Sequence, residues 1–119
     1  MTQVSRHFKR AEFACHCGKC GFDTIDAQTL EILEAVRQHF GMPVIVTSAA
    51  RCRSHNAAVG GAARSQHIYG RAADIKVAGT PPDAVHDWIA ETFPSASLGL
   101  YRTFVHVDTR TGGPARWRG

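Results

Sequence analysis

Apolar side chains recur at helical spacing in the stretch that begins near Asp26. They stand three or four residues apart, at Leu30, Leu33, Val36 and Phe40. This spacing gathers them on one face of an amphipathic helix, which we interpret as a core helix. Thr24 or Asp26 would cap its N-terminus, and Gly41 followed by Pro43 would end it.

The same spacing returns after Pro81 and Pro82, a dipeptide that favours a helix start. The apolar positions of this second amphipathic helix are Val85, Trp88, Ile89 and Phe93. A shorter helix is predicted over residues 53–59, where Gly60 and Gly61 would end it.

Runs of β-branched and other apolar residues predict the strands. Residues 44–48 form a continuous run that is typical of a buried strand. Residues 72–77 predict a second strand. Residues 98–101 and 104–108 are separated by a very short connection, so we expect a hairpin there.

The two ends of the chain show neither the helical spacing of apolar residues nor the apolar runs of strands. Residues 1–24 form an irregular head, rich in glycine and cysteine, in which Phe8 and Phe13 can cover the core. Residues 109–119 are polar except for Trp117, and we assign no regular element to them. With 119 residues in all, we expect a single domain over residues 1–119.

Composition narrows the choice of partners. Fourteen Lys and Arg against ten Asp and Glu leave a net charge of +4, and the pI is about 9.2. This balance favours a polyanion, such as nucleic acid, anionic lipid or an acidic cell wall, or reflects ordinary solubility. No run of Lys and Arg exceeds two residues, and no apolar run approaches the roughly 18 residues of a membrane span. We therefore expect no nucleic-acid partner, no membrane insertion, and a monomer.

The N-terminal residues 1–13 mix charged side chains with few apolar ones. This pattern is not that of a secretory signal. We expect synthesis in the cytoplasm without a signal peptide.

Candidate chemistry centres on residues 65–74. His67 and Asp74 are metal-binding types that stand seven positions apart, and Gly70 between them permits a bend. His106, on the strand over 104–108, supplies a third ligand. Three ligands of these types suit Zn²⁺ and leave a fourth position for water, as catalytic zinc requires.

Three further residues are candidates for the reaction itself. Arg51 directly follows a buried strand, where it would bind a substrate carboxylate, stabilise an oxyanion, or simply pair at the surface. Ser65 would contact substrate or cap a turn. Asp108 shares a strand face with His106, because side chains two positions apart on a strand point the same way.

The four cysteines form a separate feature. Cys15, Cys17 and Cys20 cluster in the head, and Cys52 follows the strand over 44–48. Their C-x-C-x-x-C spacing differs from the usual paired C-x-x-C of zinc sites. A second zinc site, two disulfides and free thiols therefore all stay open.

These motifs together resemble the M15 family of zinc peptidases. The matching strings are Ser48-Ala-Ala-Arg51, Ser65-x-His67-x-x-Gly70-x-Ala72-x-Asp74 and Phe104-Val-His106-Val-Asp108. The similarity runs from about Phe8 to Trp117. The family includes D-alanyl-D-alanine carboxypeptidases and phage L-alanyl-D-glutamate endolysins.

The resemblance implies an α+β fold of the hedgehog and DD-peptidase type, a small antiparallel sheet flanked by helices. It implies His67, Asp74 and His106 as zinc ligands. It also implies that Arg51 polarises the scissile carbonyl or holds the substrate, and that Ser65 contacts the substrate.

One position departs from the family pattern. Many members carry an acidic general base three residues before the last zinc ligand, where this chain has Thr103. Asp108 is the nearest substitute, and it would act as the base, orient His106, or pair with Arg110.

The expected function is hydrolysis of amide bonds in the stem peptides of bacterial peptidoglycan, with the enzyme released to the wall through a holin-type route. Either the L-Ala-D-Glu bond or the D-Ala-D-Ala bond would be cut. Two alternatives are a zinc-bearing cell-wall-binding module without hydrolysis and a basic nucleic-acid-binding protein with a structural zinc.

Overall fold

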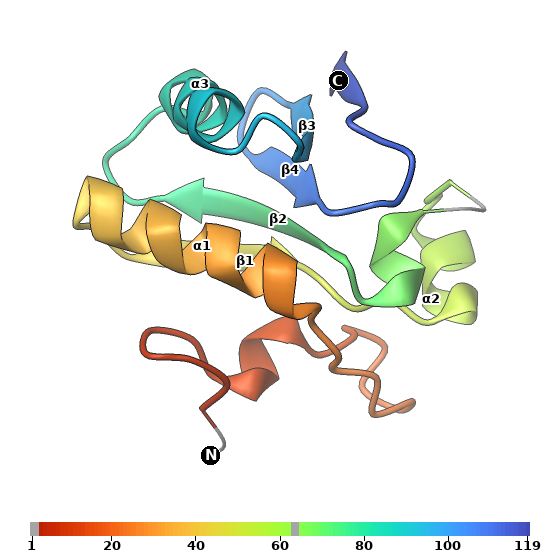
Figure 1. The fold of residues 1–119 in the computed structure, drawn as a ribbon. Coiled ribbons are helices and arrows are strands. Elements are labelled where there is room, and N and C mark those ends of the chain that lie inside the picture. Colours follow the sequence, from red (N-terminus) through yellow and green to blue (C-terminus); the bar gives the residue numbers. More distant parts are fainter. Residues whose placement is uncertain (1–2, 63–64) are drawn as a thin grey trace.

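The computed structural model describes residues 3–62 and 65–119. A five-stranded sheet in the order β1-β2-β4-β3-β5 forms its centre, and neighbouring strands are antiparallel except for β3 and β5 (Figure 1). The strands are β1 Val44–Ser48, β2 Ala72–Val77, β3 Ser97–Leu100, β4 Val105–Asp108 and β5 Arg116–Arg118. The helices are α1 Ala27–Phe40, α2 Arg53–Ala58 and α3 Pro82–Thr92, with two 3₁₀ turns, η1 Arg10–Phe13 and η2 Gln66–Tyr69. The predicted α+β fold with a small, mostly antiparallel sheet is confirmed.

The helix boundaries follow the local signals in the sequence. Of the two predicted caps for α1, Asp26 is the one used, because its side chain accepts a hydrogen bond from the backbone N–H of Thr29. Gly41 ends the helix in the left-handed conformation, with φ of 64°. Helix α3 begins at Pro82 as predicted, and α2 ends at Ala58, one residue short of the prediction.

The core lies between the sheet and the helices α1 and α3. These two helices contact each other as well as the strands, so they share one face of the sheet. Leu33 and Val36 of α1 and Ile89 of α3 are buried against strand residues such as Ile75 and Val107. Because strand side chains alternate, Val107 turns to this core while its neighbours His106 and Asp108 turn to the other face.

The C-terminal tail differs from the prediction. Residues Arg116–Arg118 form β5, which pairs parallel to β3 at the edge of the sheet, with Gly99 opposite Trp117. A strand of two arginines and one tryptophan is too short to show the alternating pattern from which a strand is predicted. Gly99 permits the pairing, because a Cβ there would lie 2.5 Å from the Trp117 indole.

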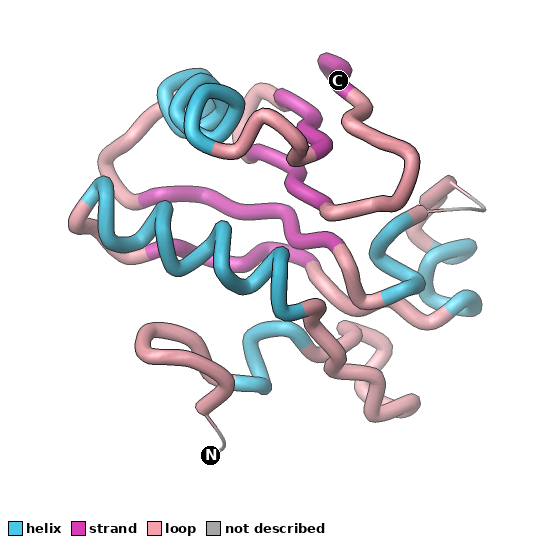
Figure 2. The backbone as a smooth tube through the Cα atoms, viewed as in Figure 1, coloured by secondary structure: helices cyan, strands magenta, loops and turns pink. Residues whose placement is uncertain are grey.

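The head is irregular apart from η1 and lies at the opposite end of the molecule from the C-terminal strand (Figure 2). Phe8 and Phe13 are 1% and 0% exposed, with ring centroids 5.8 Å apart, so they cover the core as predicted. Among the described residues, none of the helices combines the length and apolarity that crossing a membrane would demand.

Candidate metal centre

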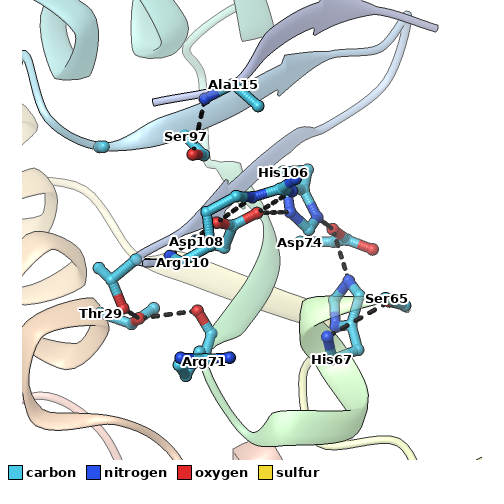
Figure 3. A network of polar contacts seen from close by, with 12 residues as sticks. Thr29, Ser65, His67, Arg71, Asp74, Ser97, His106, Asp108, Arg110 and Ala115 are labelled. Carbon is cyan, nitrogen blue, oxygen red and sulfur yellow. Dashed lines mark hydrogen bonds and ion pairs between the residues drawn. The ribbon is translucent and has the colours of Figure 1, made fainter. Parts of the chain in front are cut away.

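Sheet register brings two of the three predicted ligands together. Asp74 on β2 lies directly opposite His106 on β4 in an antiparallel pair. His67 lies in η2, the turn that precedes β2, and Gly70 closes this turn with φ of 68°. The left-handed backbone at Gly70 reverses the chain, so the His67 side chain comes back over Asp74 (Figure 3).

Contacts from α1 hold this turn in place. The backbone N–H of Asp26 donates to the carbonyl of Gly70 at 2.7 Å. The hydroxyl of Thr29, one turn into the helix, donates to the carbonyl of Arg71 at 2.9 Å (Figure 3). The first turn of α1 therefore fixes where β2 starts, and with it the position of Asp74.

The three ligand atoms converge on one point. His67 Nε2 lies 3.2 Å from Asp74 Oδ1, and His106 Nδ1 lies 2.9 Å from the same oxygen. Both imidazoles are buried, and the Asp74 side chain is 13% exposed. The three residues that the sequence predicts as ligands are thus neighbours in the structure.

The tautomer of His67 follows from the partner of Nδ1, the ring nitrogen that faces away from Asp74. Nδ1 lies 2.6 Å from the carbonyl oxygen of Ala49. A carbonyl only accepts, so Nδ1 carries the hydrogen and donates it. In the neutral imidazole, the Nε2 lone pair is then left facing Asp74.

His106 is oriented in the same way by a carboxylate. Its Nε2 lies 2.7 Å from Asp108 Oδ2. Asp108 is fully buried and receives hydrogen bonds from Arg110, from Nε to Oδ1 at 2.9 Å and from Nη2 to Oδ2 at 2.7 Å. Burial raises the pKa of Asp108, but the hydrogen bonds from Arg110 and His106 outweigh it and hold the pKa well below its usual range. An ionised Asp108 accepts the Nε2 hydrogen and leaves the Nδ1 lone pair facing Asp74.

This donor set fits a divalent metal ion. Two imidazole lone pairs and a carboxylate oxygen point at one another, and a metal ion between them, or a proton on an imidazole, relieves that arrangement. Burial raises the pKa of Asp74, but with a proton in place of the metal His106 or His67 donates to its carboxylate, and these hydrogen bonds lower the pKa to about 2. Ligands at about 2.0–2.2 Å from a tetrahedral zinc stand roughly 3.4 Å apart, close to the spacing of these atoms.

Arg51 lies beside the centre. Its backbone N–H donates to the carbonyl of His67 at 3.0 Å, and its Nη1 donates to Asn56 Oδ1 at 3.0 Å. Nη2 is 3.9 Å from Asp74 Oδ2, and the buried Nε has no hydrogen-bond partner. The Arg51 side chain thus lines a cleft next to Asp74.

A cleft of about 520 Å³ opens over the centre. Its lining includes Arg51, Ser65, His67, Asp74 and His106, together with the aromatic residues Tyr101, Phe104 and Trp117. Ser65 also caps η2, because its Oγ accepts from the backbone N–H of His67 at 3.3 Å. Among the described residues of this lining, Asp74 is the only acid; Asp108 lies behind His106, and Thr103 is exposed outside the cleft.

Two residues near the centre went unnoticed in the sequence. Trp117 packs beside His106, with ring centroids 5.1 Å apart, and its Nε1 donates to the hydroxyl of Tyr101 at 2.9 Å. Its isolation as the one large apolar residue of a polar tail was the available signal. Asn56, which holds Arg51, is buried and carries no signal that distinguishes it from other helix asparagines.

Two middle strands and the turn η2 present a His–Asp–His donor set to a cleft, an arrangement suited to a metal-dependent hydrolase. Comparison with protein families supports this class: the sequence model of Peptidase M15 matches residues 6–108. The chain belongs to the M15 peptidase family, as the resemblance of its motifs indicated. No curated protein matches the chain.

Proposed function

We propose that this protein is a zinc-dependent peptidase that hydrolyses amide bonds in the stem peptides of bacterial peptidoglycan. Membership of the M15 family supports a peptidase. The observation that carries the proposal is the convergence of His67 Nε2 and His106 Nδ1 on Asp74 Oδ1, with both outer nitrogens already committed as donors.

His67, Asp74 and His106 would hold the ion. Zinc bound by three protein ligands supplies Lewis acidity, which polarises a carbonyl and acidifies a water molecule. The chain's own part is to keep these ligands correctly turned. Ala49 does this for His67, and Asp108 with Arg110 does it for His106.

Arg51 would bind the negative charge of the substrate. Its guanidinium lines the cleft within 3.9 Å of Asp74, and its Nε is unpaired. A preorganised donor of this kind stabilises charge that develops on a scissile carbonyl, or holds a substrate carboxylate. Ser65, at the rim of η2, would contact the peptide backbone.

The aromatic side of the cleft would position the peptide. Tyr101 and Phe104 stack with centroids 4.4 Å apart, and Trp117 donates to the Tyr101 hydroxyl. These aromatic rings and Arg51 line the same cleft, so an extended peptide bound there would contact both apolar surface and a cation. Cleavage of the L-Ala-D-Glu bond and of the D-Ala-D-Ala bond are both compatible with this arrangement.

Asp108 could either orient His106 or act as the general base. The geometry favours orientation of His106. The Asp108 carboxylate is fully buried and shared between Arg110 and His106, and it does not line the cleft. A general base must reach the proton it removes, directly or through one water. Its part as the base remains a prediction, with a test described below.

The scarcity of acids in the cleft also supports a second candidate, a zinc-bearing module that binds the cell wall without hydrolysis. Asp74 is the only acidic residue among the described lining residues, and it serves as a ligand. For either function we expect a monomer that acts at the wall after release, where a net charge of +4 favours anionic polymers.

Digestion of purified muropeptides, followed by mass spectrometry of the fragments, tests the proposal. The zinc-loaded protein should release fragments that identify the bond, and the His67→Ala protein should release none. Retention on insoluble peptidoglycan without any fragments would establish the binding module instead. Full activity after rigorous removal of metal would refute the zinc mechanism.

A further inference from the structure

A second convergence of metal-binding side chains lies where the head meets the connection from β1 to α2. Cys15, Cys17 and Cys20 come from the head, and Cys52 is the N-cap residue of α2. The four Sγ atoms all lie within 4.8 Å of one another. Among the described residues, this cluster and the His–Asp–His centre are the two groups of such side chains close enough to share an ion.

Three of the sulfur–sulfur distances are close to those of a tetrahedral zinc site. Cys17 Sγ lies 3.4 Å from Cys20 Sγ and 4.0 Å from Cys52 Sγ, and Cys15 Sγ lies 3.8 Å from Cys52 Sγ. Four thiolates at about 2.3 Å from a zinc ion stand roughly 3.8 Å apart. The two sulfurs of a disulfide are bonded and stand only about 2.05 Å apart. All four cysteines are free thiols in the structure.

Every sulfur of the cluster accepts a backbone hydrogen bond. Cys17 accepts from the N–H groups of Lys19 and Cys20, Cys20 from Phe22, Cys15 from Cys52, and Cys52 from His55, each at 3.4 Å. Such N–H donors stabilise a sulfur in its anionic form, the form that binds metal. The surrounding backbone is thus arranged for four thiolates.

The loop that carries three of these cysteines has little else to hold it. Its residues 16–22 are exposed or half-buried, and Gly18 and Gly21 adopt positive φ of 72° and 70°. Burial of apolar surface therefore offsets little of the conformational entropy lost when this loop is ordered. A metal ion bound there would supply the missing free energy, as it does in small metal-dependent domains.

We propose that Cys15, Cys17, Cys20 and Cys52 together bind one structural zinc ion. A tetrahedral set of four sulfurs is a closed zinc site, with no position left for substrate. Binding releases the protons of any thiols that are still protonated, so the affinity falls as the pH falls. This site is separate from the proposed catalytic centre and does not depend on it.

The site would fasten the head to the segment that carries Arg51. Cys52 follows Arg51 directly, and the backbone N–H of Ala50 donates to the carbonyl of Phe13 at 3.0 Å. Arg51 itself is tied by its N–H to the carbonyl of His67. Zinc at the cysteines therefore stabilises the side of the cleft to which Arg51 belongs, without contact with substrate.

Cobalt substitution tests the proposal without relying on activity. The His67→Ala protein, purified with reductant and loaded with Co²⁺, should show the intense near-ultraviolet thiolate-to-cobalt band and the visible bands of a tetrahedral site. Cys20→Ser in that background should lose this spectrum. Lys19→Ala, which alters an exposed residue of the same loop and keeps every sulfur, should retain it.

Thiol titration of the unsubstituted protein gives a second measurement, so the test survives if Cys20→Ser does not fold. In the zinc-loaded protein the four thiols should react with a disulfide reagent at least about tenfold more slowly than after chelation. Equal reaction rates, an absent thiolate-to-cobalt band, or recovery of iron instead of zinc at the cysteines would overturn the proposal. So would two disulfides in protein that retains native structure and binds no metal there.

Discussion

The two clusters of metal-binding side chains are built in opposite ways. The first cluster, His67, Asp74 and His106, lies on paired strands and the turn beside them. The second ring nitrogen of each histidine forms a hydrogen bond, His67 with the Ala49 carbonyl and His106 with the Asp108 carboxylate. Three of the four cysteines stand on a glycine-containing loop in which Cys15 is buried and residues 16–22 are exposed or half-buried. In the first cluster the sheet positions the ligands before any ion arrives. In the second, the ligands and their ion would position the loop.

The difference has a general physical reason. A reaction centre needs ligands held by a rigid frame, with one coordination position left open to the cleft. A structural centre gains its free energy by closing all positions and by ordering chain that would otherwise be mobile. Removal of metal should therefore abolish function at the first cluster and loosen structure at the second.

The largest expected effect comes from replacing a ligand of the first cluster. His106→Ala or His67→Ala should lower muropeptide hydrolysis below detection, because the three-ligand set is broken. Circular dichroism and metal analysis should show an intact fold that still holds the zinc of the cysteines. Loss of both zinc ions from either variant would contradict the independence of the two clusters.

Replacing Arg51 should have the next largest effect. Arg51→Lys keeps the charge but loses the planar group that bonds Asn56 and, in the proposed function, would bond the substrate. We expect kcat to fall on the order of 10²–10³-fold, as when an oxyanion donor is removed. Zinc content should stay that of the parent protein. Unchanged kinetics would place Arg51 outside the reaction.

Asp108→Asn separates the two roles of Asp108. If Asp108 orients His106, as its burial and its bonds to Arg110 favour, zinc affinity should weaken roughly 10–100-fold, and added zinc should restore much of the rate. A general base would instead cost about 10²–10⁴-fold in rate with zinc affinity unchanged. Isothermal titration of zinc together with rates at saturating zinc distinguishes these outcomes.

Chelation should expose the head before it affects the sheet. Hydrogen exchange followed by mass spectrometry should show faster exchange over residues 15–22 in metal-free protein, while β2 and β4 keep their protection. The sheet retains its backbone bonds without metal, whereas the loop has few. Equal loss of protection in both regions would show that the two clusters do not differ as proposed.

The smallest expected effect concerns the other end of the head. Glu34 on α1 accepts hydrogen bonds from the Ser5 hydroxyl and from the His7 backbone N–H. Burial raises the pKa of Glu34, but these bonds and His7 outweigh it and lower the pKa from its model-compound value of 4.5.

A carboxylate with a lowered pKa stabilises the fold above its unfolded-state pKa, and this contribution is lost as the pH falls through the folded-state pKa. Glu34→Gln should therefore reduce stability at pH 7 by at most about 1 kcal/mol. The difference from the parent protein should vanish in acid. Urea unfolding of both proteins at pH 7 and at acidic pH measures it.

The sequence by itself determined most of the elements and the candidate metal ligands His67, Asp74 and His106. Several signals act within a few residues and can therefore be recognised in the sequence alone. They are the helix periodicity, the Asp26 cap, the prolines at the start of α3 and the run that forms β1. His67, Gly70 and Asp74 form a local motif of the same kind. The resemblance of the motifs also identified the family correctly.

Only the tertiary structure decided how distant parts meet. It brought Cys52 to three sulfurs more than thirty residues away, tied Asp108 to Arg110 behind His106, and added β5 at the edge of the sheet through Gly99 and Trp117. These outcomes depend on strand register, on the face to which each side chain turns, and on chain reversal in loops. Such quantities arise from the packing of the entire chain, because residue type and spacing restrict which contacts are chemically suitable but not which of them come within reach.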